Sequence, residues 1–395
     1  MRYCFYSGYA DLKGGYTTLL ISLITGLVNK GEQVVLINYN DGLIVRELNK
    51  NNIHVTILDI DHLNKKNVSN YIFPTDILII SKFHEYFNLL MEVNPTICYY
   101  DINDFITDIS SYKFGLKFYY LSQKLIFELL NKKALWFMDD TGTFNIKSKF
   151  DLEIQESSLL PIPVSIPYSE NQYLLRHNKE PGTIEATYIG RSVNWKLSPL
   201  EKVLSDCSRL QKHILFYILV DDKNELERLL PIKKYESATL EIKIFENYPP
   251  SEIESFLINH SDLHFGMGTA ALHGAILGIP TILIDASENK FPEDYSYSWL
   301  YETQDYCLGR FIEKRGFRKG KPLGEIFDHV TEINSKIEIS EKTFEYVVSN
   351  HKLEIVVDKL MKLASQSQFH LQDAQPYVPY YFKTHKVLKK LFSIK

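Results

Sequence analysis

From Phe265 to Thr281 the chain reads FGMGTAALHGAILGIPT. The apolar start of this stretch is typical of a strand, and the small residues from Thr269 onward are typical of a helix. Gly278 and Pro280 then predict the end of that helix and the start of another strand. The stretch therefore predicts a strand, a glycine-rich turn, a helix and a second strand in succession. Free backbone amides and the positive end of the helix dipole would meet at the turn, where phosphate is the natural ligand.

The candidate phosphate-binding residues of this turn are Gly268, Thr269 and Ala270, and the Thr269 hydroxyl can add one further donor. His273 lies one helical turn further on, and its imidazole could bond a ribose hydroxyl or a phosphate. Two alternatives stay open. Glycine and alanine could serve only close packing of the helix on the sheet, and His273 could be a satisfied histidine beneath the helix.

A second motif runs from Tyr188 to Lys196 and reads YIGRSVNWK, after an apolar strand and before a helix. Gly190 would let the backbone approach a ligand closely. Arg191 supplies a planar fork for phosphate oxygens, and Lys196 supplies a mobile point charge. A diphosphate would need both, because it carries two negative groups, and its charge would grow if it were the leaving group of a reaction. The alternative is a pair of surface cations at a loop.

Short apolar strands alternate with amphipathic helices along the whole chain, which predicts βαβ units and parallel sheets. Between Leu159 and Tyr168 three prolines interrupt this pattern and predict a linker. We expect strands in the first part at Arg2–Tyr6, Val34–Asn38, Val55–Leu58, Ile77–Ile80, Ile97–Tyr100 and Ala134–Met138. In the second part we expect strands at Ile184–Ile189, Ile214–Val220, Leu240–Phe245, Leu263–Phe265 and Thr281–Ile284, with a helix at Pro199–Cys207.

In order and spacing these motifs resemble retaining GT-B glycosyltransferases, broadly those of family four. Gly190, Arg191 and Lys196 resemble the GR-x4-K element, and residues 266–280 resemble the donor-binding helix. Residues 245–253, with Tyr248 and Pro249, resemble the turn along the nucleobase. Residues 13–15, with Gly14 and Gly15, resemble the glycine loop of the N-terminal domain, and residues 161–164 resemble the entry to the second domain.

The resemblance implies an α/β fold of two Rossmann-like domains facing across a cleft, with the final helix crossing back to the N-terminal domain. We expect an acceptor-binding domain at 1–163, a nucleotide-sugar-binding domain at 164–365 and a returning basic, aromatic segment at 366–395. The implied activity is transfer of a sugar, with retention of configuration, from a nucleotide-sugar to a glycan or lipid-linked hydroxyl in bacterial surface polysaccharide or lipopolysaccharide synthesis. No metal or other cofactor is expected. The implied donor-binding residues are Gly14, Gly15, Gly190, Arg191, Lys196, Tyr248, Pro249, Gly268, Thr269, Ala270 and His273.

In the first domain the segment 99–105 follows a strand and contains Asp101 and Asp104. A similar Tyr-Asp-x-x-Asp segment lies near the acceptor in the resembling enzymes, so either carboxylate could orient or deprotonate an acceptor hydroxyl. With Arg191 and Lys196 they form the predicted catalytic set. The alternative is that these aspartates cap the next helix. The pair Asp139-Asp140 is a weaker candidate, which we expect in a solvated loop.

Many enzymes of this family carry two glutamates whose places are held here by Phe265 and His273. This departure favours a rival hypothesis, a catalytically degenerate GT-B module that binds a glycan or a partner protein. A sugar-nucleotide epimerase is another rival, although no convincing pair of acid and base carboxylates is evident in the second domain. A nicotinamide dehydrogenase fits least, because residues 266–268 lack the third glycine and the acidic ribose ligand.

The composition of the 395-residue chain restricts its partners. The formal net charge of −5 gives no global basic field, so nucleic acid is not an expected partner. The four cysteines have no metal-ligand spacing, and no signal peptide or membrane span is evident, so we expect a cytoplasmic protein.

The final segment Pro376–Lys395 is aromatic and carries five lysines and no acid. One hypothesis is a peripheral contact with the inner face of a membrane that bears a lipid-linked acceptor, and the alternative is packing onto the N-terminal domain. If the membrane hypothesis holds, the full chain should co-sediment with vesicles containing anionic lipid, and a chain ending at Gln375 should bind them less. Equal binding by both forms would exclude this role for the segment.

Overall fold

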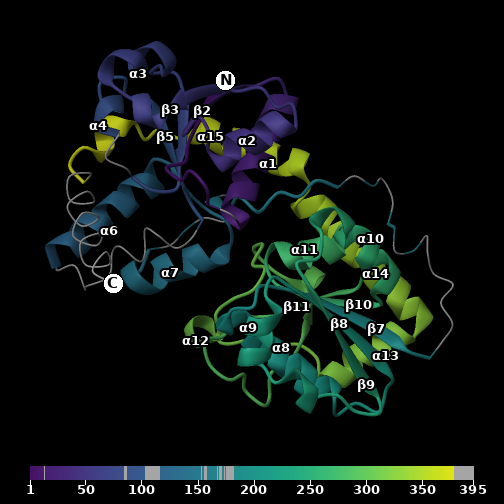
Figure 1. Cartoon of the computed structure of the whole chain (residues 1–395). Coiled ribbons are helices and arrows are strands. Elements are labelled where there is room, and N and C mark those ends of the chain that lie inside the picture. The colour runs from purple at the N-terminus through teal and green to yellow at the C-terminus, as the bar shows by residue number, and fades with distance from the viewer. Residues whose placement is uncertain are drawn as a thin grey trace. The chain divides into compact units, whose positions relative to one another are not determined.

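A computed structural model describes residues 1–12, 14–83, 87–102, 116–152, 154, 158–166, 168, 171–172, 174 and 182–377. The chain divides into two compact units, each with its own sheet and covering helices (Figure 1). The N-terminal unit comprises Met1–Ser165 together with Leu353–Lys395, and the C-terminal unit comprises Ile166–Lys352. No helix in the described part of the chain is both long and apolar enough to span a bilayer.

The N-terminal unit contains a six-stranded parallel sheet in the order β3-β2-β1-β4-β5-β6. Its strands are β1 Arg2–Tyr6, β2 Gln33–Asn38, β3 Thr56–Asp59, β4 Ile77–Ile80, β5 Thr96–Asp101 and β6 Leu135–Phe137. Its helices are α1 Gly15–Asn29, α2 Leu43–Lys50, α3 Lys65–Tyr71, α4 Phe87–Leu90, α6 Leu116–Asn131, α7 Asp140–Phe150 and α15 Leu353–Gln366.

The C-terminal unit also contains a six-stranded sheet, in the order β12-β11-β10-β7-β8-β9. All its pairs are parallel except β11 with β12. The strands are β7 Ile184–Ile189, β8 Ile214–Val220, β9 Leu240–Glu246, β10 Leu263–Gly266, β11 Thr281–Leu283 and β12 Ser298–Trp299. The helices are α8 Asn194–Cys207, α9 Lys223–Leu229, α10 Ile253–His260, α11 Thr269–Ala275, α12 Ile312–Arg315, α13 Leu323–Thr331 and α14 Ile333–Asn350.

Both sheets are covered on both faces, which is why their strands are apolar throughout. In β8, Phe216 and Ile218 belong to the core that includes α8, whereas Tyr217 and Leu219 pack with Phe256 of α10. Successive strand residues thus face opposite helical layers. The strand order reverses between β1 and β4 in one unit and between β7 and β10 in the other. The carboxyl ends of the strands at such a switch point are where open α/β sheets bind ligands.

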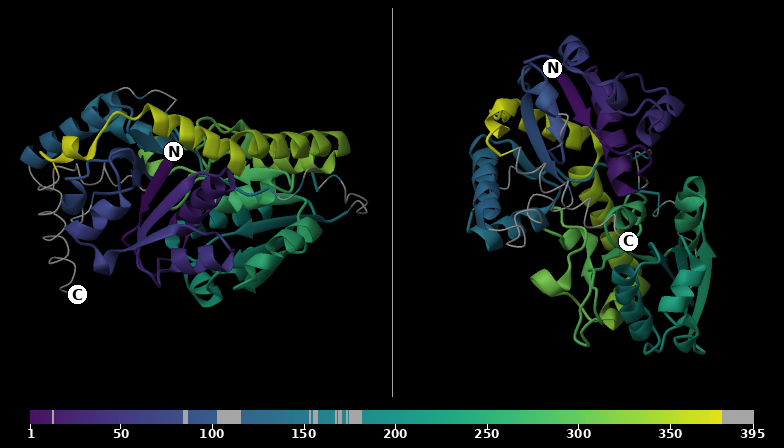
Figure 2. Two further views of the ribbon diagram at one scale, coloured as in Figure 1. Left: turned by 90° about the horizontal axis from the view of Figure 1, so that it is seen from above. Right: turned by 60° about the vertical axis from the view of Figure 1, so that its left-hand side comes forward.

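Helix α15 returns the chain to the N-terminal unit. Its buried residues join the core built by α1, α2 and the first sheet, and α15 lies against α1 in Figures 1 and 2. The expected return of the chain is therefore present. It begins at Leu353, whereas the sequence placed the boundary at residue 366, because the apolar face of α15 continues the helical pattern of α14 without a break in composition.

The strands expected from the sequence are all present, and the division between the units after Ser165 falls within the expected linker. Two expectations need correction. Helix α8 begins at Asn194 and contains Pro199, instead of beginning at that proline. Asp139 and Asp140 lie at the start of α7 and not in a solvated loop, since Asp139 Oδ1 accepts the Thr141 amide at 2.8 Å as an N-cap.

Gly26 sits where α1 contacts α15. A Cβ atom at this position would lie 2.5 Å from Val357 Cγ2 and 3.0 Å from Leu353 Cδ1. We predict that Gly26→Ala destabilises the protein by about 1–3 kcal/mol through overpacking, despite the helix propensity of alanine. Denaturant unfolding would measure this, and Val357→Ala in the same chain should restore part of the loss. A double variant that shows the sum of the two single losses would rule out this contact as the cause.

Candidate functional site

Two cations meet at the switch point of the C-terminal unit. Arg191 follows β7, and Lys196 lies in the first turn of α8. Both lie over the same aromatic ring, because the Arg191 Cζ atom is 6.0 Å and the Lys196 Nζ atom 5.3 Å from the centroid of Trp195. The structure therefore brings together the two basic residues that the sequence singled out. The Trp195 ring supports both cations. The sequence motif contains this residue, but the sequence analysis assigned it no role.

The charge of this pair is only partly compensated. Helix α8 has no acidic residue in its first turn and no side-chain cap, so a lysine there lies at the positive end of the helix dipole. Burial lowers the pKa of Lys196 to about 8, and the nearby Arg191 charge acts in the same direction. Neither side chain has an ion-pair or hydrogen-bond partner among the residues that the structure describes. A bound anion would reduce the repulsion between these two cations and accept hydrogen bonds from both.

Asp221 fixes the loop that carries Arg191. Its Oδ1 atom accepts the Ser192 amide at 2.7 Å, and Ser192 Oγ donates to the Asp222 carbonyl at 2.5 Å. The Asp221 carboxylate also favours the charged form of Lys196, although less strongly than burial and Arg191 oppose it. Sequence reasoning missed Asp221. The available signal was its place directly after the strand at 214–220, where the carboxyl ends of parallel strands converge.

Gly190 is required by the strand beneath it. A Cβ atom there would overlap the hydroxyl of Tyr188, which is fully buried and donates to the Lys196 carbonyl at 3.1 Å. The glycine therefore lets the loop turn over the Tyr188 ring, and that ring in turn holds the first turn of α8. This structural requirement exists whether or not a ligand approaches the backbone.

The glycine-rich turn after β10 has two kinds of glycine. Gly268 has φ 59° and ψ −138°, a conformation that favours glycine, and it precedes α11. Gly266 and Gly274 instead serve close packing, since added Cβ atoms would lie 2.7 Å from the Ala271 nitrogen and 2.6 Å from His264 Cδ2. The packing alternative thus explains these two positions.

Only part of the turn is available to a ligand. The Gly268 amide donates to the Leu308 carbonyl at 2.6 Å, so it cannot also serve a phosphate. Thr269 is exposed and Ala270 is buried. Because α11 has seven residues, its dipole is a weak contributor, and the side-chain charges of Arg191 and Lys196 give the site its main attraction for an anion.

Two histidines lie in or next to α11, and their surroundings differ. His264, fully buried in β10, lies 2.9 Å from Thr187 Oγ1 through Nδ1 and 2.9 Å from the Ala270 carbonyl through Nε2. A carbonyl only accepts, so Nε2 carries the proton, and burial lowers the pKa of this imidazole to about 4. His264 is thus a neutral structural tie. His273 is half-buried on α11, and burial lowers its pKa as well.

Tyr248 and Pro249 follow β9 at the same carboxyl edge of the sheet. The Tyr248 ring packs 4.9 Å from Phe256 and 5.9 Å from Phe245, and Pro249 is exposed. Strand β9 lies two strand spacings from β7, which is about 10 Å. That separation suits a base at one end and a diphosphate at the other end of one nucleotide.

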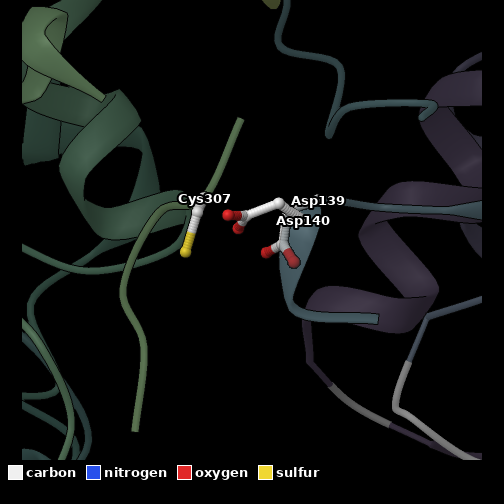
Figure 3. Close-up of side chains that lie close together, drawn as sticks. All are labelled: Asp139, Asp140 and Cys307. Atoms are coloured by element: carbon white, nitrogen blue, oxygen red, sulfur yellow. The ribbon is translucent and has the colours of Figure 1, made fainter. Parts of the chain in front are cut away.

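In the N-terminal unit, the predicted residues lie at the carboxyl ends of β1 and β5. Gly14 and Gly15 are exposed at the start of α1, and Asp101 is buried as the last residue of β5. Asp104 lies outside the described residues. Figure 3 shows Asp139 and Asp140 side by side at the start of α7. We assign no metal to these carboxylates, because Cys307, drawn with them, belongs to the other unit.

Comparisons with known proteins support the fold. No protein-family profile and no curated protein sequence matches the chain significantly. Among solved structures, the chain is similar to a glycosyltransferase from Rickettsia africae, with TM-score 0.55 and 13% identity over 92% of this chain and 98% of that chain. Anabaena HepE in complex with UDP and glucose gives TM-score 0.54 and 10% identity over 92% and 99%.

The lipopolysaccharide outer core galactosyltransferase WaaB gives TM-score 0.52 and 12% identity over 92% of this chain and 99% of that chain. These neighbours are GT-B glycosyltransferases, so the expected two-domain α/β fold is confirmed. At such low identity the likeness is one of fold, and it does not assign the chain to family four.

The lowered pKa of Lys196 has a measurable consequence for anion binding. Because its pKa is about 8, Lys196 loses its proton as the pH rises through that value, far below the ordinary range of lysine. We predict that the affinity for inorganic pyrophosphate falls between pH 7 and pH 9 more steeply in the wild type than in Lys196→Arg. The arginine keeps its charge, and the ionisation of pyrophosphate is the same for both proteins. Identical pH profiles, measured by calorimetry, would contradict the assignment.

Proposed function

We propose that this protein transfers a sugar from a nucleoside-diphosphate sugar to a hydroxyl group of a glycan or lipid-linked acceptor. One observation carries the proposal: Arg191 and Lys196 lie at the switch point of the C-terminal unit over a single indole ring, with no direct ion-pair partner among the described residues. A departing diphosphate would gain two charge-assisted contacts there as its charge develops. The fold supports the proposal because glycosyltransferases share it, and one of them holds UDP and glucose.

The finer assignments are also proposals. The nucleobase would lie along Tyr248 and Pro249, and the diphosphate would contact Arg191, Lys196 and the amides of Thr269 and Ala270. Retention of configuration rests on the motif resemblance alone. A role in surface polysaccharide or lipopolysaccharide synthesis rests on the same resemblance, and the similarity of fold to a lipopolysaccharide galactosyltransferase agrees with that role. In the N-terminal unit, Asp101 is the proposed acceptor-orienting carboxylate, and no metal is required.

A degenerate binding module is the second candidate, and the place of Phe265 favours it. This residue is fully buried and stacks on Phe216 with a centroid distance of 5.8 Å, so it contacts no ligand. His273, at the other glutamate position, is half-buried and has a lowered pKa. Its neutral imidazole can still bond a hydroxyl. The second candidate predicts binding of a glycan or a partner protein without sugar transfer.

A thermal-shift screen against UDP, GDP, ADP, dTDP and CMP, with their common sugar conjugates, tests the proposal. We expect one nucleoside diphosphate to raise the melting temperature, and we expect Arg191→Ala and Lys196→Ala to lose most of this shift and most of the turnover. Arg209→Ala is the control for loss of a cation, because Arg209 is exposed beyond the opposite end of α8 and pairs with Asp206 and Glu293.

Each alternative result identifies a different function. A response to CMP alone would keep a transferase but remove the diphosphate roles of Arg191 and Lys196. No response to any nucleotide would favour the degenerate module. Wild-type kinetics in both alanine variants would remove the phosphate assignment.

A further inference from the structure

One loop of the C-terminal unit joins the two candidate donor-binding segments. The Leu308 carbonyl accepts the Gly268 amide at 2.6 Å, which fixes the turn before α11. Phe311 packs on Trp195 with a centroid distance of 5.7 Å, which supports the ring beneath Arg191 and Lys196. The segment 308–311 therefore touches both halves of the site. Arg310, which the sequence analysis did not single out, lies between these two contacts.

The backbone around Arg310 is fixed from two sides. Its carbonyl accepts the Ala286 amide at 2.8 Å, and the next amide along, that of Ser287, donates to the Trp195 carbonyl at 3.2 Å. The latter bond depends on Pro199, which has no N–H and so leaves the Trp195 carbonyl without its intrahelical donor. Two adjacent amides thus connect Arg310 to the first turn of α8.

The direction of the Arg310 side chain follows from strand alternation. Ala286 and Phe311 pair in a parallel bridge, and Phe311 faces the core that contains α8. Arg310 therefore faces the other side, the one shared by Asp285 and α11. The turn that contains Gly268 is tied to the same segment, because the Gly268 amide donates to the Leu308 carbonyl two residues before Arg310.

The Arg310 guanidinium acts on the buried Asp285 only through its charge, and Asp285 is shared with Arg318. Asp285 is 1% exposed, and its Oδ1 atom accepts from the Arg318 guanidinium and from the Arg310 backbone amide at 3.2 Å. The charges of Arg318 and Arg310 both oppose the burial that raises the pKa of Asp285, so two cations share this one carboxylate. The Arg310 guanidinium has no hydrogen bond or ion pair among the described residues, and its Nε atom is buried without a partner. A buried unpaired donor is costly, and the cost is removed if a ligand supplies the acceptor.

We propose that Arg310 is a further donor-binding residue, whose guanidinium contacts the phosphate group of the donor that bears the sugar. This inference rests on the proposed function. Each phosphate of the donor carries one negative charge while the sugar is attached, and the released nucleoside diphosphate carries about three at neutral pH. Arg191 and Lys196 supply two positive charges, which Asp221 partly offsets. Arg310 supplies the missing charge from the β10–β11 side of the switch point, and its fork suits two phosphate oxygens.

Calorimetry with matched mono- and diphosphates tests this assignment. The probes are the nucleoside 5′-diphosphate that the wild type selects and the 5′-monophosphate of the same base. We expect Arg310→Ala to lower the affinity for the diphosphate by about tenfold or more, as for the loss of a charged hydrogen bond. The affinity for the monophosphate should be nearly unchanged. Arg310→Lys should recover part of the affinity because it restores the charge without the fork. Arg209→Ala should bind both probes as the wild type does.

A structural role for Arg310 gives a different pattern. If Arg310 only stabilises the fold, Arg310→Gln and Arg310→Ala should both lower the melting temperature and reduce the affinity for the two nucleotides equally. That result would overturn the inference. Diphosphate affinity equal to the wild type in Arg310→Ala, with the affinity lost in Arg191→Ala, would overturn it while leaving the proposed function intact. A wild type that binds no nucleotide would overturn both.

Discussion

The parallel pairing of β7 with β10 is the constraint on which the candidate site depends. Because the strand order reverses at this pair, the chain leaves β7 toward one face and β10 toward the other, and the two loops open a space at the carboxyl edge. Arg191 and Lys196 follow the first of these strands, and Gly268 and Thr269 follow the second. Residues far apart in sequence thus become neighbours through one strand pair, and the segment 308–311 then holds both loops.

The electrostatics of this edge differ from those of the rest of the C-terminal unit. Elsewhere in the C-terminal unit, cations lie beside carboxylates, as Lys202 does with Asp206 and Arg318 with Asp285. At the switch point the same unit places cations together, one of them at the positive end of a long helix and with a lowered pKa. Repulsion between neighbouring cations destabilises the folded protein in the absence of an anion. Groups with perturbed pKa values cluster at functional sites, which supports the proposed anion-binding role.

The sequence predicted the strands well because each is a short apolar run, and it predicted Arg191 and Lys196 because one motif contains both. It could not predict Asp221 or Arg310, whose importance comes from strands and loops that meet only in the folded unit. It placed the start of α8 at Pro199, since a proline normally begins a helix, whereas here Ser287 satisfies the carbonyl that the proline leaves free. The packing roles of Gly266 and Gly274 agree with an alternative that the sequence left open, although the atoms that they accommodate, in Ala271 and His264, could be identified only in the folded unit.

The return of α15 also sets the order in which the two cores can be completed. The C-terminal unit is one continuous stretch, Ile166–Lys352, whereas the N-terminal unit needs Leu353, Val356, Val357 and Leu360 for its core. During synthesis on the ribosome, the second unit can therefore close its core while the first still exposes the apolar face of α1. The part of the protein that is made first is the last to become complete, and its exposed surface is the natural target for a chaperone in the interval.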